Sequence, residues 1–488
     1  MLADSTPSDT SATVSGQLQS CQRSCARWKS RALALVLGGL LGLDGCKSLP
    51  RVDNSMAAQA APHVQLDSAR GPLSKQQSNA ILTVLKRKSG ADDILDKHMR
   101  LVQSMVDSPL VVGNKVSLLQ DDAAAYHAML TAIRSAKNNI NMETYIFDDD
   151  HAGNKFGQLL REKQDQGVQV NLIYDSIGSL NTPRAFFEDL TQHGVSIVEF
   201  NPVNPLRLNK FWRLNNRDHR KLLVVDGKTV FTGSINISDS FSSGALVKSK
   251  QEGATSGSGT GWRDTDIRIE GPVVAEFQKL FFDTWEKQKG PSLGQQDYYP
   301  KLSAQGHDIV LAIGSRYDNP SHVMYVTLIS AIKSAEFYVH LTNAYFVPDR
   351  QLVEALEDAA QRGVDVELVL PAKSDSLLTL YAGRSHFDDL LEHGVKIFLR
   401  QGAIVHSKTA VIDGVWSSVG STNLDWRSFL HNDELNALIL GSDFARQMEE
   451  WFKADRDQSL ALSRDAWSRR SPLSRIREWG ARLWQYWL

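Results

Sequence analysis

Two short segments of the chain carry the same six residues at the same spacing. The pattern is HxKxxxxDxxxxxxGSxN, which occurs as HRKLLVVD followed by GSIN and again as HSKTAVID followed by GSTN. The first copy contains His219, Lys221, Asp226, Ser234 and Asn236, and the second contains His406, Lys408, Asp413, Ser421 and Asn423. With average residue usage, one copy would arise by chance in on the order of one in 100,000 chains. We therefore interpret the two copies as a duplicated functional site.

The spacing within each copy predicts that its side chains meet at one ligand. A His and a Lys two residues apart on a β-strand project to the same face, so both can contact one cluster of ligand atoms. Asp226 and Asp413 follow apolar strands and precede Gly, which is a turn position. Two roles are open for these carboxylates: holding the strand end or neighbouring groups, or contacting the substrate.

The segments around the two copies are themselves duplicated. Residues 130–147 (LTAIRSAKNNINMETYIF) resemble residues 329–346 (ISAIKSAEFYVHLTNAYF), and two later helix-to-strand segments, at Gly167 and Gly363 and at Thr191 and Leu391, match in the same order. Each half alternates helix and strand three times, which predicts an α/β fold with helices flanking a sheet. The period near 200 residues indicates two domains rather than a solenoid.

Length and composition agree with this division. A chain of 488 residues is long enough for two or three domains with cores of their own. We expect a leader at 1–46, a linker and helical segment at 47–109, domains at 110–300 and 301–460, and a basic amphipathic helix at 461–488. The formal net charge of −2 argues against a protein that coats nucleic acid. The three cysteines lie within the first 46 residues, so the body has no Cys-based metal site.

On these residues the chain resembles the phospholipase D superfamily, and within it the bacterial cardiolipin synthases. The resemblance spans about residues 110–460 and includes ETYIF at Glu143, RDHRK at Arg217, WRDTDIRIEGP at Trp262 and GSTNLDWRSFLHNDELN at Gly420. It implies two pseudo-symmetric α-β-α domains with mixed sheets and an active site at their interface. A Ser- and Gly-rich stretch at about 242–261 departs from the pattern, and we expect a mobile loop there.

The resemblance also implies a mechanism and roles for the motif residues. By analogy, His219 is the nucleophile that forms a phosphohistidine, and His406 is the general acid and base. Lys221, Lys408, Asn236 and Asn423 would stabilise the phosphate oxygens, with Ser234 and Ser421 as weaker candidates. Since the two ammonium groups can do the electrostatic work of a divalent ion, we expect no catalytic metal and no cofactor.

Two further carboxylates occupy equivalent positions in the halves. Alignment of the repeats places Asp264 opposite Glu434. A carboxylate beside an imidazole raises the pKa of the imidazole and fixes its tautomer. The resemblance implies this orienting role for both residues, and the alternative is a pair of surface carboxylates.

A basic run precedes the first motif. It contains Arg207, Lys210, Arg213, Arg217 and Arg220, with Phe211 and Trp212 among them. The run is a candidate site for phosphate headgroups, and its aromatic residues favour contact with a membrane interface. A solvated charged loop is the other interpretation.

The two ends of the chain carry membrane-related patterns. Basic residues from Arg23 to Arg31 precede the apolar run ALALVLGGLLGL and then LDGC, which resembles a lipoprotein signal with Cys46 as the lipidation candidate. Simple secretion, an uncleaved anchor and a buried segment are the alternatives. After Pro472, the residues Leu473, Ile476, Leu483, Trp484 and Trp487 follow one side of a helix, among several arginines. This pattern is typical of an interfacial helix, and docking on the protein's own body is the alternative.

Three functions remain open at this point. The first is a phosphatidyltransferase that forms cardiolipin from phosphatidylglycerol, with phosphatidylethanolamine as a possible second substrate. The second is a hydrolase of the same superfamily, a phospholipase D or, less favoured, a nuclease. The third is a non-catalytic lipid-binding lipoprotein. For the first we expect phospholipid substrates, a membrane surface in the bacterial cell envelope, no nucleic acid and no obligate protein partner.

Overall fold

The computed structural model describes residues 48–52, 63–89, 92–119, 121–202, 215–241, 261–318 and 322–488. The chain divides into the units Met1–Ser48 and Leu49–Leu488, and the second of these is described below. The predicted leader with Cys46, most of the basic run including Phe211 and Trp212, and residues 242–260 lie outside the described residues. Within the described part of the chain, no helix has the length and apolar character needed to cross a membrane.

The first half contains one mixed sheet. Its elements are β3 (Leu110–Leu119), α5 (Asp122–Ser135), β4 (Asn139–Thr144), α6 (His151–Asp165), β5 (Gln169–Asp175), α7 (Arg184–Gln192), β6 (Ser196–Phe200), β7 (Arg217–Asp218), β8 (Leu222–Val225), β9 (Thr229–Gly233), the 3₁₀ turn η2 (Asp239–Phe241), β10 (Trp262–Arg263), β11 (Asp266–Glu270) and α8 (Val274–Lys287). The strand order is β3-β11-β9-β8-β4-β5-β6. Only the β4–β5–β6 pairs are parallel.

The second half repeats this arrangement. Its elements are β12 (Asp308–Ser315), α9 (Val323–Ser334), β13 (Tyr338–Asn343), β14 (Phe346–Val347), α10 (Arg350–Gln361), β15 (Asp365–Pro371), α11 (Leu377–Arg384), α12 (Phe387–Glu392), β16 (Lys396–Arg400), β17 (Ile404–Val405), β18 (Lys408–Ile412), β19 (Trp416–Gly420), β20 (Leu424–Asp425), α13 (Trp426–Leu430), β21 (Asn432–Leu440) and α14 (Ser442–Asp457). The strand order is β12-β21-β19-β18-β13-β15-β16, again with parallel pairs only at the β13–β15–β16 end.

Shorter elements flank the two halves. Before β3 lie β1 (Leu66–Ser68), β2 (Gly71–Pro72), α3 (Lys75–Ser89) and α4 (Asp92–Met105), and after α14 come β22 (Ser459–Leu462), α15 (Arg464–Ser468), α16 (Pro472–Arg482) and η3 (Gln485–Trp487). Strand β22 adds to the edge of the second sheet beside β16. The predicted boundaries at 110, 300 and 460 stay predictions; β3 begins at Leu110, whereas β22 runs across residue 460.

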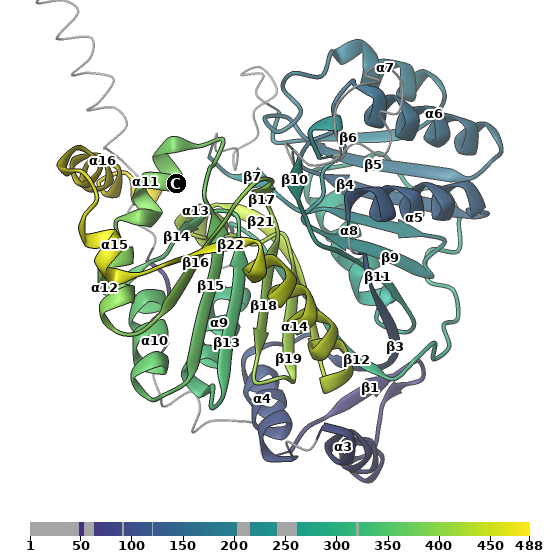
Figure 1. Cartoon of the computed structure of the whole chain (residues 1–488). Coiled ribbons are helices and arrows are strands. Elements are labelled where there is room, and N and C mark those ends of the chain that lie inside the picture. Colours follow the sequence, from purple (N-terminus) through teal and green to yellow (C-terminus); the bar gives the residue numbers. More distant parts are fainter. Residues whose placement is uncertain are drawn as a thin grey trace, which may run out of the picture. The chain divides into compact units, whose positions relative to one another are not determined.

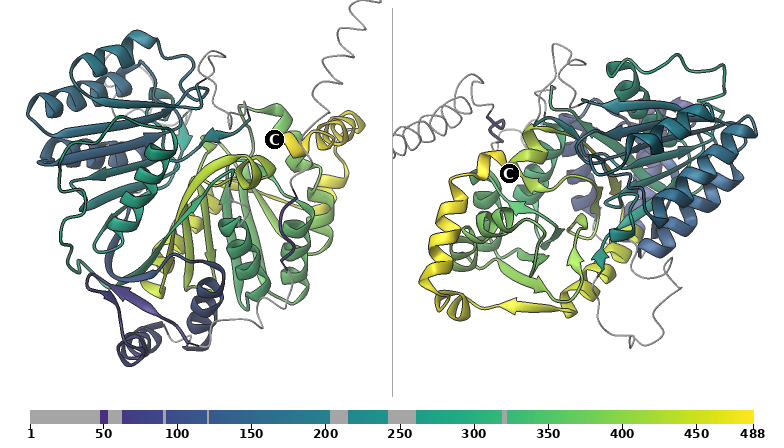
Figure 2. Two further views of the ribbon diagram at one scale, coloured as in Figure 1. Left: turned by 180° about the vertical axis from the view of Figure 1, so that it is seen from behind. Right: turned by 90° about the horizontal axis from the view of Figure 1, so that it is seen from above.

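The identical strand order confirms the predicted duplicated α/β fold. The two sheets are continuous, because β3 pairs antiparallel with β12 and each of these strands is the first of its half (Figure 1). In the views of Figure 2, helices cover both sheets on their two faces. Helices α5, α6 and α7 supply the core on one face of the first sheet, and α9 and α10 supply the core of the second.

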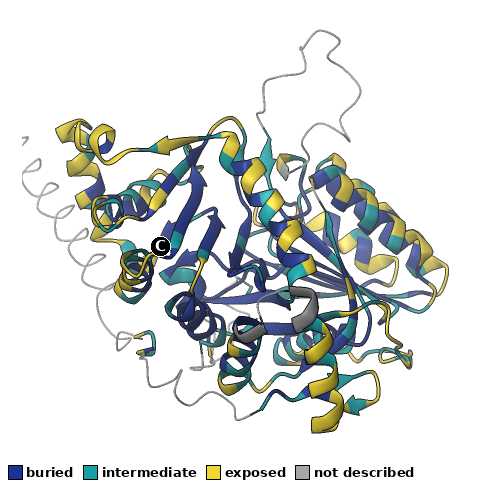
Figure 3. Cartoon of the chain, turned by 60° about the horizontal axis from the view of Figure 1, so that its bottom comes forward, coloured by how far each residue is buried: buried dark blue, intermediate teal, exposed yellow. Residues whose placement is uncertain are grey.

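Alternate residues of the central strands belong to different cores. In β8, Leu223 and Val225 join the core under α5–α7, whereas Leu222 and Val224 join a core that also contains Phe277 of α8. This is the period of two expected of a strand covered on both faces. The latter core includes side chains of α14 and β21 as well, so it is shared by the halves. Figure 3 shows the result, with the strands buried and the exposed positions concentrated on the outer faces of the helices.

Candidate active site

Two pairs of very short strands cross between the halves at the motif histidines. Strand β7, which ends immediately before His219, pairs in parallel with the start of β21 in the second half, so that Asp218 lies opposite Asp433. Strand β17, which ends immediately before His406, pairs in parallel with β10 of the first half, so that Val405 lies opposite Arg263. In both cases the backbone N–H of the His donates to the partner strand, at 2.9 Å to the carbonyls of Asp433 and Arg263.

This register places each imidazole beside a carboxylate of the other half. The residues that follow the paired positions are His219 and Glu434 in one case and His406 and Asp264 in the other. The Nδ1 atom of His219 lies 3.1 Å from both carboxylate oxygens of Glu434. The Nδ1 atom of His406 lies 2.7 Å from Oδ1 of Asp264. Both carboxylates are fully buried, which excludes the surface alternative, and the exchange between halves is a feature that alignment of the repeats did not reveal.

Three of the four His and Lys residues precede the strands on which they were predicted to lie. His219 and Lys221 stand between β7 and β8, and His406 lies between β17 and β18, with Lys408 as the first residue of β18. The prediction that each pair projects from one continuous strand is therefore wrong, because the chain leaves the sheet to form the interdomain strand pair. Each Lys nevertheless folds back to its own His: the Nζ atom donates to the His carbonyl, at 2.7 Å from Lys221 to His219 and at 2.5 Å from Lys408 to His406.

Burial governs the charges of these groups. It lowers the pKa of Lys221 to about 8 and that of Lys408 to about 7. Burial and the charge of Lys408 lower the pKa of His406 to about 4, although Asp264 acts in the opposite direction. Burial and the two lysines also lower the pKa of His219 well below its ordinary value. Asp264 therefore raises the pKa of the His406 imidazole, as expected, but burial and Lys408 outweigh its effect.

Polar side chains of the GSxN segments hold the two carboxylates. Ser421 donates to Oε2 of Glu434 at 2.5 Å, and Asn432 donates to Oε1 at 3.1 Å. Burial raises the pKa of Glu434 to about 7 despite these donors and Lys221. In the first half, Oγ of Ser234 accepts from the N–H of Thr265, next to Asp264. The serines therefore support the carboxylates or their immediate neighbours, and their contact with phosphate stays a prediction.

The two motif glycines, Gly233 and Gly420, allow their strands to lie very close to the chain segments that directly follow Asp264 and Glu434. A Cβ on Gly233 would lie 2.1 Å from a carboxylate oxygen of Asp266, and one on Gly420 would lie 2.3 Å from the carbonyl of Leu435. Both contacts are far inside van der Waals distance. Any side chain at these positions would push the carboxylate-bearing strand away from the histidine.

The side chains of the motif asparagines, Asn236 and Asn423, differ in their hydrogen bonding. The side-chain oxygen of Asn236 accepts from the N–H of Ile146 at 3.2 Å, which orients its amide group. The side-chain oxygen of Asn423 is buried and has no hydrogen-bond partner among the described residues. Asn423 and His219 together line a pocket of about 230 Å³.

The motif aspartates lie at the far ends of their strands. Asp226 follows β8 and accepts from the backbone N–H groups of residues 137–139, with the shortest contact 2.7 Å from Asn138. Asp413 follows β18 and accepts from residues 336–338 and from His98 at 3.2 Å. Both have positive φ angles, 52° and 53°. These hydrogen bonds hold the turn and the neighbouring strand, which is the first of the two roles left open, and a catalytic role for either aspartate stays a prediction.

The described part of the basic run is structural. Arg217 pairs with Asp175 at 3.0 Å and donates to the carbonyls of Phe200 and Asn201. Arg220 donates to Thr284 at 2.7 Å and to the carbonyl of Ser315 at 2.9 Å. Both side chains are fully buried, so neither belongs to a solvated loop, and the bulk of each guanidinium is committed to the protein.

Sequence reasoning missed several groups around the histidines. The ring of Tyr145 lies 5.0 Å from that of His219, and the ring of Trp262 lies 4.9 Å from that of His406, both edge to face. Asp266 accepts from the N–H groups of Ser234 and Ile235, and burial raises its pKa to about 7. Arg427 lines the pocket beside His219. The signal for Arg427 was its place in the motif segment GSTNLDWRSF.

Among the described residues, one group has metal-binding potential. It consists of His340, Asp365 and Glu367, near the beginnings of β13 and β15. The active-site residue Lys408 pairs with Asn343 at the other end of β13. Its carboxylates already pair with cations: Lys396 lies 2.7 Å from Asp365, and Arg456 lies 3.1 Å from Glu367. This group is separate from the histidine site, and the absence of a catalytic metal stays a prediction.

Comparison with known proteins agrees with this geometry. The family described as "Cardiolipin synthase, PLD-like domain" matches residues 129–244 and 328–456, one match in each half. The chain is 32% identical over 400 residues to a cardiolipin synthase of Listeria monocytogenes, covering 80% of both chains. It is 33% identical over 397 residues to cardiolipin synthase 2 of Bacillus cereus, covering 79% of this chain and 74% of that one. A solved phosphatidylserine synthase of Haemophilus influenzae has a similar fold, with a TM-score of 0.60 and 14% identity over 80% of this chain and 100% of that one.

Two histidines, each with a Lys and with a carboxylate from the opposite half, define an enzyme of the phospholipase D superfamily. Within it, the chain belongs to the cardiolipin synthase family of PLD-like domains.

Replacing Asp413 with Ala should lower stability without disabling chemistry. The change leaves three backbone N–H groups without their acceptor, and we expect a loss of about 1–3 kcal/mol, seen as a lower thermal unfolding midpoint. The folded protein should keep its kcat. Asp413→Asn is the matched control, because Asn retains an acceptor and tolerates positive φ. Loss of kcat at an unchanged unfolding midpoint would instead show that Asp413 takes part in catalysis.

Activity should fall as the pH rises above neutrality. Burial gives Lys408 and Lys221 pKa values of about 7 and 8, so their positive charge is present below these values and lost above them. A phosphodiester keeps one negative charge throughout this range, and its attraction to the site weakens as the lysines deprotonate. We expect kcat/KM for a dispersed phosphatidylglycerol donor to show an alkaline limb near pH 7–8. A profile that stayed flat to pH 10 would contradict the lowered pKa values.

Proposed function

We propose that this protein is a phosphatidyltransferase that forms cardiolipin by transferring a phosphatidyl group to a hydroxyl of phosphatidylglycerol. The observation that carries the proposal is the pair of buried imidazoles, each oriented by a carboxylate of the other half. The relatives named as cardiolipin synthases, matched over most of their length, support the choice of reaction. A phosphatidylglycerol or a phosphatidylethanolamine would serve as donor.

In the first step, Nε2 of His219 attacks phosphorus. Glu434 holds Nδ1, which leaves Nε2, on the opposite side of the ring, as the attacking atom. An N–P bond forms and the P–O bond to the donor's small alcohol breaks, with His406 giving that oxygen a proton. Splitting one displacement into two lowers each barrier. The choice of His219 over His406 rests on family analogy, since the site is pseudo-symmetric.

In the second step, the acceptor hydroxyl attacks the phosphohistidine. His406 takes the hydroxyl proton, the new O–P bond forms, and the N–P bond to His219 breaks, which returns both imidazoles to their starting states. Lys221, Lys408, Asn236 and Asn423 would donate to the non-bridging oxygens as charge builds there. The bound phosphodiester also supplies a negative charge that raises the pKa of His406 toward the range that an acid requires.

Product analysis tests the reaction. Purified protein is incubated with phosphatidylglycerol, with and without phosphatidylethanolamine, and the lipids are resolved. We expect cardiolipin as the main product, also after exhaustive chelation, because the two ammonium groups carry the positive charge. Phosphatidic acid as the sole product would show that the protein is a hydrolase. Unchanged lipids would indicate a non-catalytic lipid-binding protein.

Substitution of the histidines tests their roles within the same assay. His219→Ala should abolish turnover, and wild-type protein quenched in alkaline denaturant, in which the N–P bond of phosphohistidine is stable, should carry the phosphorylated intermediate on His219. Trapping the phosphate on His406 instead would reverse the assignment.

We also propose that the protein works at a membrane surface, to which its C-terminal segment binds. Helix α16 docks on α11 through Glu478 and Ala481, and Glu478 pairs with Arg470 at 2.9 Å. The opposite side carries Leu473, Ile476, Trp479, Leu483, Trp484 and Trp487, whose exposed fractions run from 44% to 67%. One side of the helix therefore docks on the protein's own body, and the other side is exposed, as binding to a membrane interface would require. Figure 1 shows α16 beside α11 at the edge of the second half.

The composition of this surface matches an anionic bilayer. Arg469, Arg475, Arg477 and Arg482 are exposed around the apolar side chains, and Leu377 on the adjacent α11 is 62% exposed. Tryptophan and arginine together are typical of interfacial helices. Trp487 and Ser376 also line the pocket at His219, so the surface is continuous with the entrance that lipid headgroups would use. A location in the bacterial cell envelope and acylation of Cys46 stay proposals, the second outside the described residues.

Two substitutions on α16 test the surface without removing the helix. Ile476→Ser combined with Trp479→Ser should reduce binding to phosphatidylglycerol vesicles by about tenfold or more, since both exposed side chains would otherwise enter the bilayer. Flotation with vesicles measures the bound fraction. Leu460→Ser is the matched control, as Leu460 is 60% exposed on β22. Equal flotation of all three proteins would remove the proposal.

A further inference from the structure

The pocket beside His219 contains two arginines, Arg217 and Arg427, in addition to the motif residues. Its volume of about 230 Å³ extends from His219 and Tyr145 to α11, α13 and the last two residues of the chain. His406, Lys221 and Lys408 do not line it. The pocket therefore lies to one side of the position where the reacting phosphorus would sit, and its polar groups are available to another part of a substrate.

Arg427 supplies a charge in this pocket that the protein does not neutralise by an ion pair. It lies on α13, is half-buried, and its guanidinium makes no ion pair or hydrogen bond with any described residue. Its backbone is fixed, because its N–H donates to a main-chain oxygen of Leu488 at 2.8 Å and its carbonyl accepts from the backbone N–H of His431 at 2.8 Å. Asp425 lines the same pocket and feels the charge of Arg427, but no ion pair joins the two, so the guanidinium can still donate to an anion.

A second, fully buried guanidinium reaches the same pocket. Arg217 spends Nε and Nη2 on Asp175, Ser176 and two carbonyls, but its Nη1 is buried without a hydrogen-bond partner among the described residues. An unpartnered buried donor costs free energy unless a ligand satisfies it. Asp425 also lines the pocket, and it accepts from the N–H of Ser428 at 2.7 Å.

We infer that Arg427, aided by Nη1 of Arg217, forms a subsite for a second phosphodiester, the one that the acceptor lipid carries and does not react. The inference rests on the proposed function. In phosphatidylglycerol the attacking hydroxyl and its own phosphate are joined by a three-carbon bridge, so the second phosphate must lie close beside the reacting one. Water has no such group, and the subsite therefore selects a lipid acceptor over hydrolysis.

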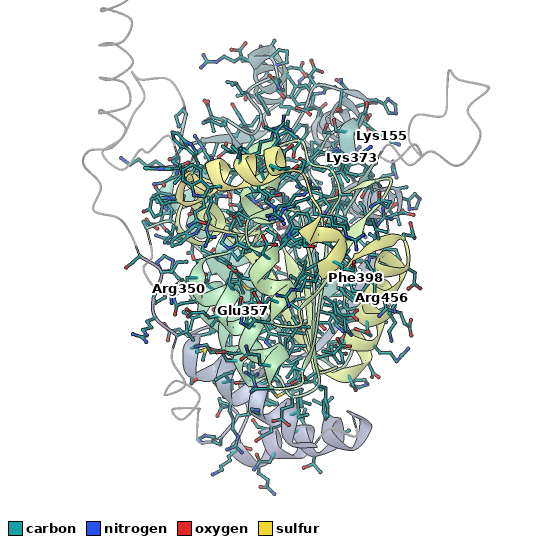
Figure 4. All side chains as sticks on the ribbon, turned by 60° about the vertical axis from the view of Figure 1, so that its left-hand side comes forward. Lys155, Arg350, Glu357, Lys373, Phe398 and Arg456 are labelled. Atoms are coloured by element: carbon teal, nitrogen blue, oxygen red, sulfur yellow. The ribbon has the colours of Figure 1, made fainter. Side chains whose placement is uncertain are left out.

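The partition between two products tests the subsite. With phosphatidylglycerol vesicles, Arg427→Gln should form cardiolipin about ten- to a hundredfold more slowly, the loss expected of one charged hydrogen bond, while phosphatidic acid forms at the wild-type rate or faster. Arg427→Lys should recover part of the cardiolipin rate because it restores the charge. Arg350→Gln is the control, since Arg350 is 91% exposed on α10 and lies at the surface in Figure 4.

A soluble acceptor gives a second readout. With the same donor vesicles, wild-type protein should use labelled glycerol 3-phosphate better than labelled glycerol, and this preference should disappear in Arg427→Gln. Parallel loss of both lipid products, an unchanged product ratio, or an unchanged acceptor preference would overturn the inference. Wild-type protein that makes only phosphatidic acid would instead overturn the proposed function, and the inference with it.

Discussion

The parallel pairing of β7 with β21 and of β17 with β10 is the constraint on which the site depends. Each pair is two residues long, yet it fixes the register between strands that are 215 residues apart in the chain in one case (Asp218 and Asp433) and 142 in the other (Arg263 and Val405). Because the residue after each pair is a histidine on one strand and a carboxylate on the other, the pairing alone decides which groups meet. Neither half can assemble a complete imidazole–carboxylate pair from its own residues.

The surrounding fold makes this short contact rigid. Strands β3 and β12 join the two sheets, and a core shared between α8, α14 and the central strands prevents the halves from sliding. Asp226 and Asp413 also stabilise this arrangement, from the other ends of β8 and β18. Each carboxylate accepts hydrogen bonds from backbone N–H groups at the start of the adjacent strand. The repetition of this Asp in both motifs is thus explained by the turn and strand that it holds, at the end of the strand away from the histidines.

Burial gives the site its electrical character. Two ammonium groups, two imidazoles and two carboxylates share an environment that disfavours every charge, and the lysines and histidines respond with lowered pKa values. A phosphodiester would supply the negative charge that favours the charged form of both lysines. In the neighbouring pocket, Arg427 has no ion-pair partner and Nη1 of Arg217 has no hydrogen-bond acceptor among the described residues, so an anion would stabilise both. The exposed apolar side of α16 and η3 lies at the edge of this pocket.

The sequence by itself determined the duplication, the α/β class, the six motif positions in each half and the two extra carboxylates, because each depends on local spacing or on repetition along the chain. It could not determine that the carboxylates are exchanged between halves, since strand register across a domain interface leaves no local periodicity. Nor could it separate Arg217 and Arg220, which are buried and paired, from a solvated basic loop, or show which side of α16 docks. Those outcomes depend on which distant groups burial brings together, and only the tertiary structure decided them.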